Sequence, residues 1–284
     1  MSFIPIKSLA AFALGWSTVI ASAAEPLVYA PLPMENLSHT QTANQPLADL
    51  LDELLEQPVE MRLYETHSDL LDALSVGEVD LAHLGPLPLL LAKARTPSLV
   101  ELAVFREADG SAQYRCVIAA PLDGLTNLTA AVSSNALPTL ALTREESTCG
   151  PTAAFTILSE QGLDPRRFLA TYLGGHDEVA RAVLLQTHQI GGLKESVAQV
   201  WSDLGLRVLA ASQPLPGMTL LVSPGSLSTE EIEALRDALL GLDKDRLAPL
   251  QIGRHGFARF DPGLLERVRT MRAKAEPLIN EVVR

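Results

Sequence analysis

The sequence predicts an α/β protein of two lobes, and three observations lead to that fold class. Short apolar runs alternate with amphipathic runs of helical spacing, which is typical of sheets flanked by helices. Polar turns follow several of the apolar runs, at the place where α/β proteins bind ligands. The chain has 284 residues, 47% of them apolar, which is enough to build substantial cores. We therefore expect each lobe to be a mixed, mainly parallel sheet flanked by helices, with a ligand cleft between the lobes.

The first part of the chain contains the elements of one α/β unit. Apolar or alternating runs predict strands at residues 27–30, 59–63, 79–84 and 99–105. Apolar residues at helical spacing predict helices between them, at residues 45–55, 68–76 and 87–94. The charged run at residues 106–109, which follows this unit, is interpreted as a solvated loop.

A second α/β unit begins with an apolar strand at residues 114–120. Further strands are predicted at residues 140–142, 170–173, 189–192, 206–210 and 219–222. Helices are predicted at residues 152–161, up to residue 185, from about residue 194, at residues 228–240 and from residue 261 onward. These elements divide the chain into a first lobe (24–111), a second lobe (112–215) and a return to the hinge and first lobe with C-terminal helices (216–284).

The N-terminus has the pattern of an export signal. Lys7 precedes an apolar run at residues 8–20, and Ala21-Ser22-Ala23 is a small-x-small cleavage site. We therefore expect a signal peptide at residues 1–23 and an exported, soluble mature chain without a lipid anchor. The formal net charge of −12 makes nucleic acid a poor partner.

The run from Glu146 to Pro151 is the stretch with the strongest chemical signal. It reads as a turn between a strand and the N-terminus of a helix, with Ser147 and Thr148 as cap residues and Pro151 in the first turn. A helix start offers free N–H groups and a partial positive charge, so it can hold an anion. An ordinary capped helix without a ligand is the alternative.

The two cysteines, Cys116 and Cys149, leave three alternatives open. A single disulfide is the usual outcome for an exported chain. Two free thiols facing the cleft would suit a soft ligand such as a trivalent arsenic oxyacid, and inert buried cysteines are the third case. Cys149 with His176 could form a nucleophile and base, but no orienting third group is evident, so we do not expect an enzyme.

The order of motifs resembles the periplasmic phosphonate- and phosphite-binding proteins of ABC transporters, which have the type II periplasmic solute-binding fold. The matching residues are 45–51, 77–86, 114–118, Ser147-Thr148-Cys149-Gly150, Gly174-Gly175-His176-Asp177 and 215–217. The resemblance implies that the Ser-Thr turn caps the anion and that the histidine after the glycines donates to it. These roles fall to Ser147, Thr148 and His176, with Cys149 and Gly150 in the same turn. Cys149 and Cys116 stand where the family commonly has serine.

The resemblance implies an exported periplasmic protein, monomeric and without a cofactor, that captures a small oxyanion for an ABC transporter permease. A phosphonate, phosphite or phosphate-like ion is the expected ligand. Relatives that bind arsenite and report to a membrane sensor kinase supply the alternative, in which Cys116, Cys149 or both hold the ligand.

Overall fold

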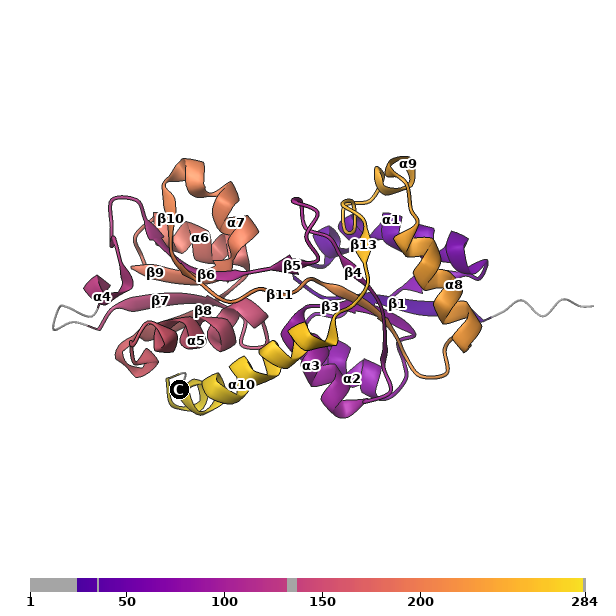
Figure 1. The fold of residues 1–284 in the computed structure, drawn as a ribbon, viewed down its shortest axis with the longest axis horizontal. Helices are drawn as coiled ribbons and strands as arrows, with labels where there is room; N and C mark the ends of the chain where they lie inside the picture. The colour runs from indigo at the N-terminus through magenta and orange to yellow at the C-terminus, as the bar shows by residue number, and fades with distance from the viewer. Residues whose placement is uncertain (1–24, 35, 132–136, 283–284) are drawn as a thin grey trace, which may run out of the picture.

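The computed structural model describes residues 25–34, 36–131 and 137–282. They form two lobes, each built on its own β-sheet, with a two-stranded ribbon between the lobes (Figure 1). The predicted two-lobed α/β fold class is therefore confirmed. The predicted signal peptide lies outside the described residues. Among the residues described, no helix combines the length and apolar character needed to cross a membrane.

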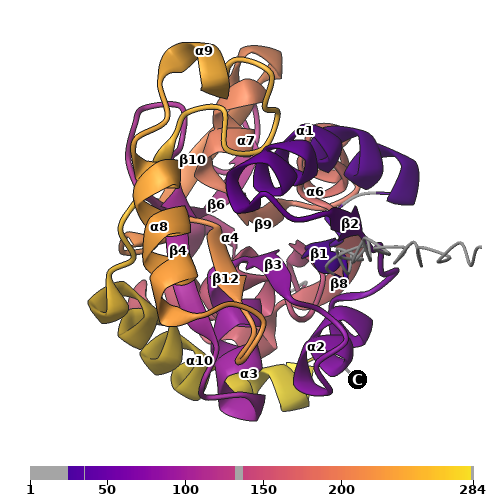
Figure 2. The same cartoon turned by 90° about the vertical axis from the view of Figure 1, so that its right-hand side faces the viewer.

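Lobe 1 is built on a six-stranded sheet with the order β13-β4-β12-β3-β1-β2. Its strands are β1 (Leu27–Pro31), β2 (Val59–Met61), β3 (Leu81–Leu84), β4 (Val100–Phe105), β12 (Thr219–Val222) and β13 (Phe257–Ala258). Helices α1 (Leu37–Leu55) and α8 (Thr229–Leu240) cover one face, and α2 (His67–Ser75) and α3 (Pro86–Arg95) cover the other (Figure 2). The short helix α9 (Lys244–Leu247) follows α8.

Lobe 2 is built on a five-stranded sheet with the order β10-β6-β9-β7-β8. Its strands are β6 (Cys116–Pro121), β7 (Thr139–Thr143), β8 (Leu169–Gly174), β9 (Ile190–Lys194) and β10 (Leu206–Ala211). Helix α5 (Ala153–Glu160) packs on one face, and α6 (His176–Leu184) and α7 (Glu195–Val200) pack on the other. The remaining short elements are α4 (Leu128–Ala131), η2 (Pro165–Arg167) and η3 (Ser202–Leu204).

The lobes are joined by an antiparallel ribbon of β5 (Gln113–Tyr114) and β11 (Leu215–Pro216). The chain enters lobe 2 through β5 and returns through β11 (Figure 1). The last helix, α10 (Pro262–Val282), begins beside β11 and contacts both α3 of lobe 1 and α5 of lobe 2. Its buried stripe, which includes Leu265, Val268 and Met271, belongs to a core cluster with residues from both lobes.

Antiparallel pairs are more frequent than the sequence predicts. Strands β6 and β12 each run antiparallel to both of their neighbours, whereas β1 and β7 pair in parallel with theirs. The reason is that β6 and β12 directly follow the ribbon strands. The chain arrives in each sheet from the other lobe, and it therefore runs against the strands of the β-α-β units.

Helix α1 begins at Leu37, well before the predicted start at residue 45. The Asn36 side chain caps it by accepting a hydrogen bond of 2.9 Å from the N–H of His39. The first two turns are mostly polar and therefore show no apolar stripe. Pro46 lies inside the helix, where the sequence would favour a break.

Candidate functional site

The predicted residues Ser147, Thr148, Cys149 and Gly150 form the connection from β7 to α5. It contains a wide helical turn, η1 (Thr148–Thr152), in which Thr148 and the two residues after it are buried. Ser147 stands at the start of this turn, but within the described chain its hydroxyl makes no capping hydrogen bond. This differs from the expected side-chain cap.

Gly150 is required by the close packing of this turn. Its N–H donates to the Ser147 carbonyl at 3.1 Å, so it closes the turn. A Cβ at this position would overlap the carbonyl oxygen of Arg144 and would lie 3.1 Å from the Thr143 hydroxyl. The residue therefore shapes the turn that presents Thr148.

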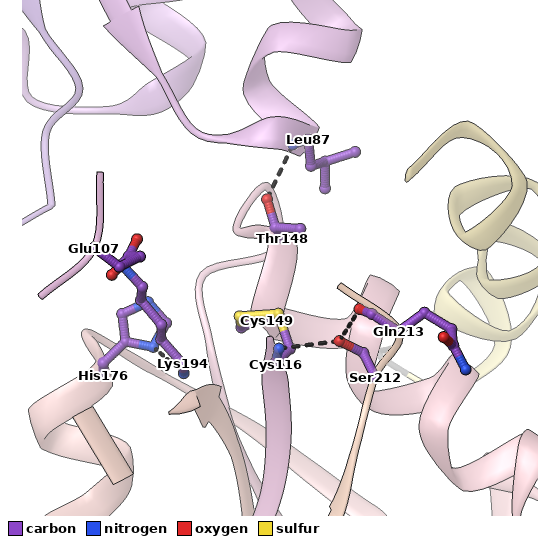
Figure 3. Close-up of a disulfide and its surroundings, with 9 residues drawn as sticks. All are labelled: Leu87, Glu107, Cys116, Thr148, Cys149, His176, Lys194, Ser212 and Gln213. Carbon is purple, nitrogen blue, oxygen red and sulfur yellow. Dashed lines mark hydrogen bonds and ion pairs between the residues drawn. A yellow bond between two sulfur atoms is a disulfide. The ribbon is translucent and has the colours of Figure 1, made fainter. Parts of the chain in front are cut away.

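The Thr148 hydroxyl of lobe 2 contacts the start of α3 in lobe 1. Its Oγ1 accepts a hydrogen bond of 2.9 Å from the N–H of Leu87 (Figure 3). Gly85, the cap residue of α3, has no side chain that could satisfy the first N–H groups of that helix. The start of α3 and the η1 turn thus meet across the lobes, and both regions favour negative charge.

A lysine and a glutamate meet beside this contact. Nζ of Lys194, the last residue of β9, lies 2.7 Å from Oε1 of Glu107 and 4.9 Å from the centre of the Tyr114 ring. Burial raises the pKa of Tyr114 well above its ordinary value; the neighbouring Thr148 side chain opposes this rise, and the charge of Glu107 adds to it.

Glu107 corrects the interpretation of the charged run at residues 106–109 as a solvated loop. Its side chain is only 18% exposed and is held by Lys194. Sequence reasoning missed both residues as site candidates. The available signal for Lys194 was its place at the C-terminal end of a strand, where α/β proteins bind ligands.

His176 is the first residue of α6, directly after the predicted glycine turn. Its Nδ1 accepts a hydrogen bond of 3.2 Å from the backbone N–H of Lys194 (Figure 3). The neutral ring therefore carries its proton on Nε2, which can act as a donor. Burial, assisted by the charge of Lys194, lowers the pKa of His176 to about 4, so the ring is neutral at neutral pH.

A second set of contacts between the lobes lies at Arg144, on the loop before η1. Its guanidinium donates to the carbonyl oxygens of Pro33 at 3.0 Å and Met34 at 3.1 Å, both in lobe 1. Nε2 of His67, at the start of α2, lies 3.2 Å from the same Pro33 oxygen. The two Arg144 hydrogen bonds join the lobes, whereas the His67 contact lies within lobe 1.

Cys116 and Cys149 are joined by a disulfide with an S–S distance of 1.99 Å and a Cα–Cα distance of 5.1 Å. Both residues are buried, and the bond ties β6 to the η1 turn immediately after Thr148. The backbone N–H of Cys116 also donates to the Ser212 hydroxyl at 3.0 Å (Figure 3). No free thiol is left among the described residues, so in this state neither sulfur can serve as a thiolate ligand.

A cavity of about 310 Å³ lies elsewhere, between α5 and α10. It is open, and charged side chains of both signs line it, including Glu160, Glu266, Arg267 and Lys274. None of the predicted site residues contributes to it. In the part of the chain that the structure describes, no group of histidine, cysteine or acidic residues is placed to hold a metal ion.

Comparison with known structures gives the same overall fold. A binding protein component of an ABC phosphonate transporter from Pseudomonas aeruginosa has a TM-score of 0.71 and 18% identity, over 88% of this chain and 87% of that one. PhnD1 from Prochlorococcus marinus, solved with methylphosphonate, has a TM-score of 0.73 and 16% identity, over 88% and 98%. A Xanthomonas citri protein bound to chloride has a TM-score of 0.72 and 18% identity, over 90% and 99%.

At such identities the likeness to these structures shows the fold, which is the type II periplasmic binding fold. The family is shown by a sequence model described as ABC transporter, phosphonate, periplasmic substrate-binding protein, which matches residues 29–265. That match covers most of the chain and includes both lobes. The chain therefore belongs to the family of periplasmic substrate-binding proteins of phosphonate ABC transporters.

Proposed function

We propose that this protein captures a small phosphonate-like oxyanion in the cleft between its lobes. The hydroxyls of Ser147 and Thr148, the N–H groups at the start of the η1 turn and Nε2 of His176 donate hydrogen bonds to the ligand oxygens. Gly150 and Cys149 shape the turn rather than supplying side-chain donors. Such neutral donors beside a helix start suit a phosphonate, phosphite or phosphate-like ion.

The observation that carries this proposal is the hydrogen bond from the Leu87 N–H to Thr148 Oγ1. It brings an anion-favouring group of each lobe to one point. When the lobes separate, both groups lose this partner and become available to a ligand. A bound oxyanion then accepts hydrogen bonds from both lobes and stabilises the closed arrangement.

The family works with ABC transporter permeases, and we propose that the closed, loaded protein delivers its ion to such a permease as a monomer. Residues 1–23 direct its export to the periplasm. The alternative of an arsenite sensor that signals to a membrane kinase finds no support. Its two candidate sulfur ligands are bonded to each other, and the family match is to a transport component.

Replacing Thr148→Val tests the proposed site. The variant keeps the shape of the side chain but lacks the hydroxyl, and each charge-assisted hydrogen bond contributes about 1.5–3 kcal/mol. We expect affinity for methylphosphonate to fall by about tenfold or more, measured by isothermal titration calorimetry, with the protein still folded.

Thr152→Val is the matched control, because Thr152 ends the same turn and its buried hydroxyl has no hydrogen-bond partner among the described residues. It should bind methylphosphonate as the wild type does. Unchanged affinity in the Thr148→Val variant would remove the turn from the site.

A further inference from the structure

The ion pair of Glu107 and Lys194 lies beside the candidate site. The two side chains are 18% and 23% exposed, so solvent screens them only in part. Lys194 belongs to lobe 2, and Glu107 follows β4 of lobe 1, immediately before the ribbon. The pair therefore joins the lobes next to the ribbon strand that carries Tyr114.

This pair is connected to the predicted ligand groups through Tyr114 and His176. The Lys194 ammonium lies over the Tyr114 ring, and Thr148 is close enough to Tyr114 to influence its pKa. The backbone of Lys194 holds His176 by its Nδ1. The charge of Glu107 acts on the Tyr114 hydroxyl. An anion at Thr148 and His176 therefore lies within electrostatic range of both members of the pair.

The charges around the candidate site nearly cancel. Lys194 is already compensated by Glu107, and His176 is neutral at neutral pH. The other charged or titratable groups that face these residues are Arg144, Glu146, His67, Asp177 and Tyr114. Arg144 is held by lobe 1 carbonyl oxygens, and Asp177 accepts a hydrogen bond from the Trp201 indole. The positive charges of Lys194 and Arg144 are offset by Glu107, Glu146 and Asp177, so this set has no excess positive charge to balance a second ligand charge.

We propose that Glu107 is a specificity-determining residue, which makes the site prefer a singly charged oxyanion to a doubly charged one. This inference rests on the function proposed above. Hydroxyl, N–H and neutral imidazole donors satisfy the oxygens of either ion. A second ligand charge costs more desolvation, and Glu107 cancels the attraction of Lys194 that would otherwise offset this cost. At an effective dielectric constant of about 20, the cancelled attraction corresponds to about tenfold in affinity per ligand charge.

The test uses methylphosphonate, which passes from one to two negative charges as pH rises through neutrality. Its affinity is measured by calorimetry between about pH 6 and about pH 9 for the wild type and for Glu107→Gln. For the wild type, affinity should fall by about tenfold over this range. At the acidic end, the affinity of Glu107→Gln should exceed that of the wild type by about tenfold, and at the alkaline end by about a hundredfold. The affinity of this variant should therefore no longer fall as pH rises.

Glu101→Gln is the matched control. Glu101 lies 2.7 Å from Lys93 in an ion pair of the same lobe, with exposed fractions of 17% and 26%, and it is not part of the candidate site. This variant should keep the pH dependence of the wild type. If Glu107→Gln keeps it as well, the inference is overturned.

Lys194→Gln provides a second, independent variant should Glu107→Gln fail to fold. It leaves the Glu107 carboxylate uncompensated, so the fall in affinity with rising pH should become steeper; an unchanged slope would overturn the inference.

The two proposals fail in different ways. If the wild-type protein binds methylphosphonate at no pH, the proposed function and this inference are both contradicted. If binding is weakened by Thr148→Val but its pH dependence is unchanged by Glu107→Gln, only this inference is contradicted.

Discussion

His83 lies fully buried in lobe 1, within a small polar network. Its Nδ1 is 2.7 Å from the Tyr29 hydroxyl, which donates to Asn44 Oδ1 at 3.1 Å. Because the hydroxyl gives its proton to Asn44, Nδ1 of His83 donates to the hydroxyl oxygen. Nε2 is buried and has no hydrogen-bond partner in the part of the chain that the structure describes. Burial lowers the pKa of His83 to about 3.

His83 should therefore make the stability of the protein depend on acidity. The folded state keeps the ring neutral, whereas the unfolded chain takes up a proton below about pH 6.5. The contribution of His83 to the unfolding free energy is fully present above that pH and is lost as pH falls toward about 3. In His83→Gln, the number of protons taken up on unfolding near pH 5 should fall by about one. The slope of the unfolding free energy against pH, from denaturant titrations, measures this number; an equal slope in both proteins would contradict it.

The single residues predicted for the site are those whose signal is local in the sequence. Thr148, Gly150 and His176 stand in short turns whose composition is distinctive, and the structure places these turns at strand ends of lobe 2. Glu107 and Lys194 were missed because each has its partner in the other lobe, far away in the sequence. Along the sequence, a charged residue in such a pair has the same kinds of neighbours as a charged residue that solvent surrounds.

At the scale of elements, the disulfide between β6 and the η1 turn is the contact with the largest expected effect. It closes a loop with a sequence separation of 33 residues, which restricts the unfolded chain. In the double variant Cys116→Ser, Cys149→Ser, the unfolding free energy should fall by about 2–4 kcal/mol. Urea denaturation with and without reductant measures this change.

The unfolding free energy of the double variant should not change when reductant is added, and the reduced wild type should have the same unfolding free energy as the double variant. Thiol alkylation establishes that the wild type has been reduced. A fully reduced wild-type protein that retained its original urea midpoint would show that the bond contributes nothing to stability.

Most elements were predictable because their apolar residues repeat at the period of the element. The start of α1 was not, since its first turns are polar and Asn36 supplies the cap. The ribbon of β5 and β11 was also not predictable, because two-residue strands have no period to detect. Their pairing follows from the way the two lobes are joined, as do the antiparallel neighbours of β6 and β12.

For the whole molecule, the balance between the open and closed arrangements is the property that matters for transport. Arg144 joins the lobes through the carbonyl oxygens of Pro33 and Met34. Arg144→Ala removes both hydrogen bonds and should weaken closure by about 1–2 kcal/mol, a factor of five to thirty in the ratio of closed to open protein. Small-angle X-ray scattering of the ligand-free protein should show a larger radius of gyration.

Arg236→Ala is the control for this prediction. Arg236 also donates to two backbone carbonyl oxygens, those of Leu102 at 3.1 Å and Glu101 at 3.0 Å, but all three residues lie in lobe 1. Its removal should lower stability without changing the scattering of the folded protein. Equal scattering of the Arg144→Ala variant and the wild type would show that this contact does not hold the lobes closed.

The two-lobed architecture was predictable because alternating strands and helices occur in two successive units. The way in which the lobes meet was not, because it depends on a few polar contacts that they make with each other. These contacts join residues such as Leu87 and Thr148, whose sequence positions give no sign that they meet.

The position of the disulfide also affects when this protein becomes able to bind. Sulfur–sulfur bonds rarely persist in the reducing cytoplasm, where a precursor is synthesised amid abundant phosphorylated metabolites. The disulfide links the turn that carries Thr148 to β6, and a precursor with reduced cysteines lacks this link. In the periplasm, where proteins of this family work, oxidation would form the link. Maturation would thus keep the nascent protein from sequestering the phosphate esters of the cell's own metabolism.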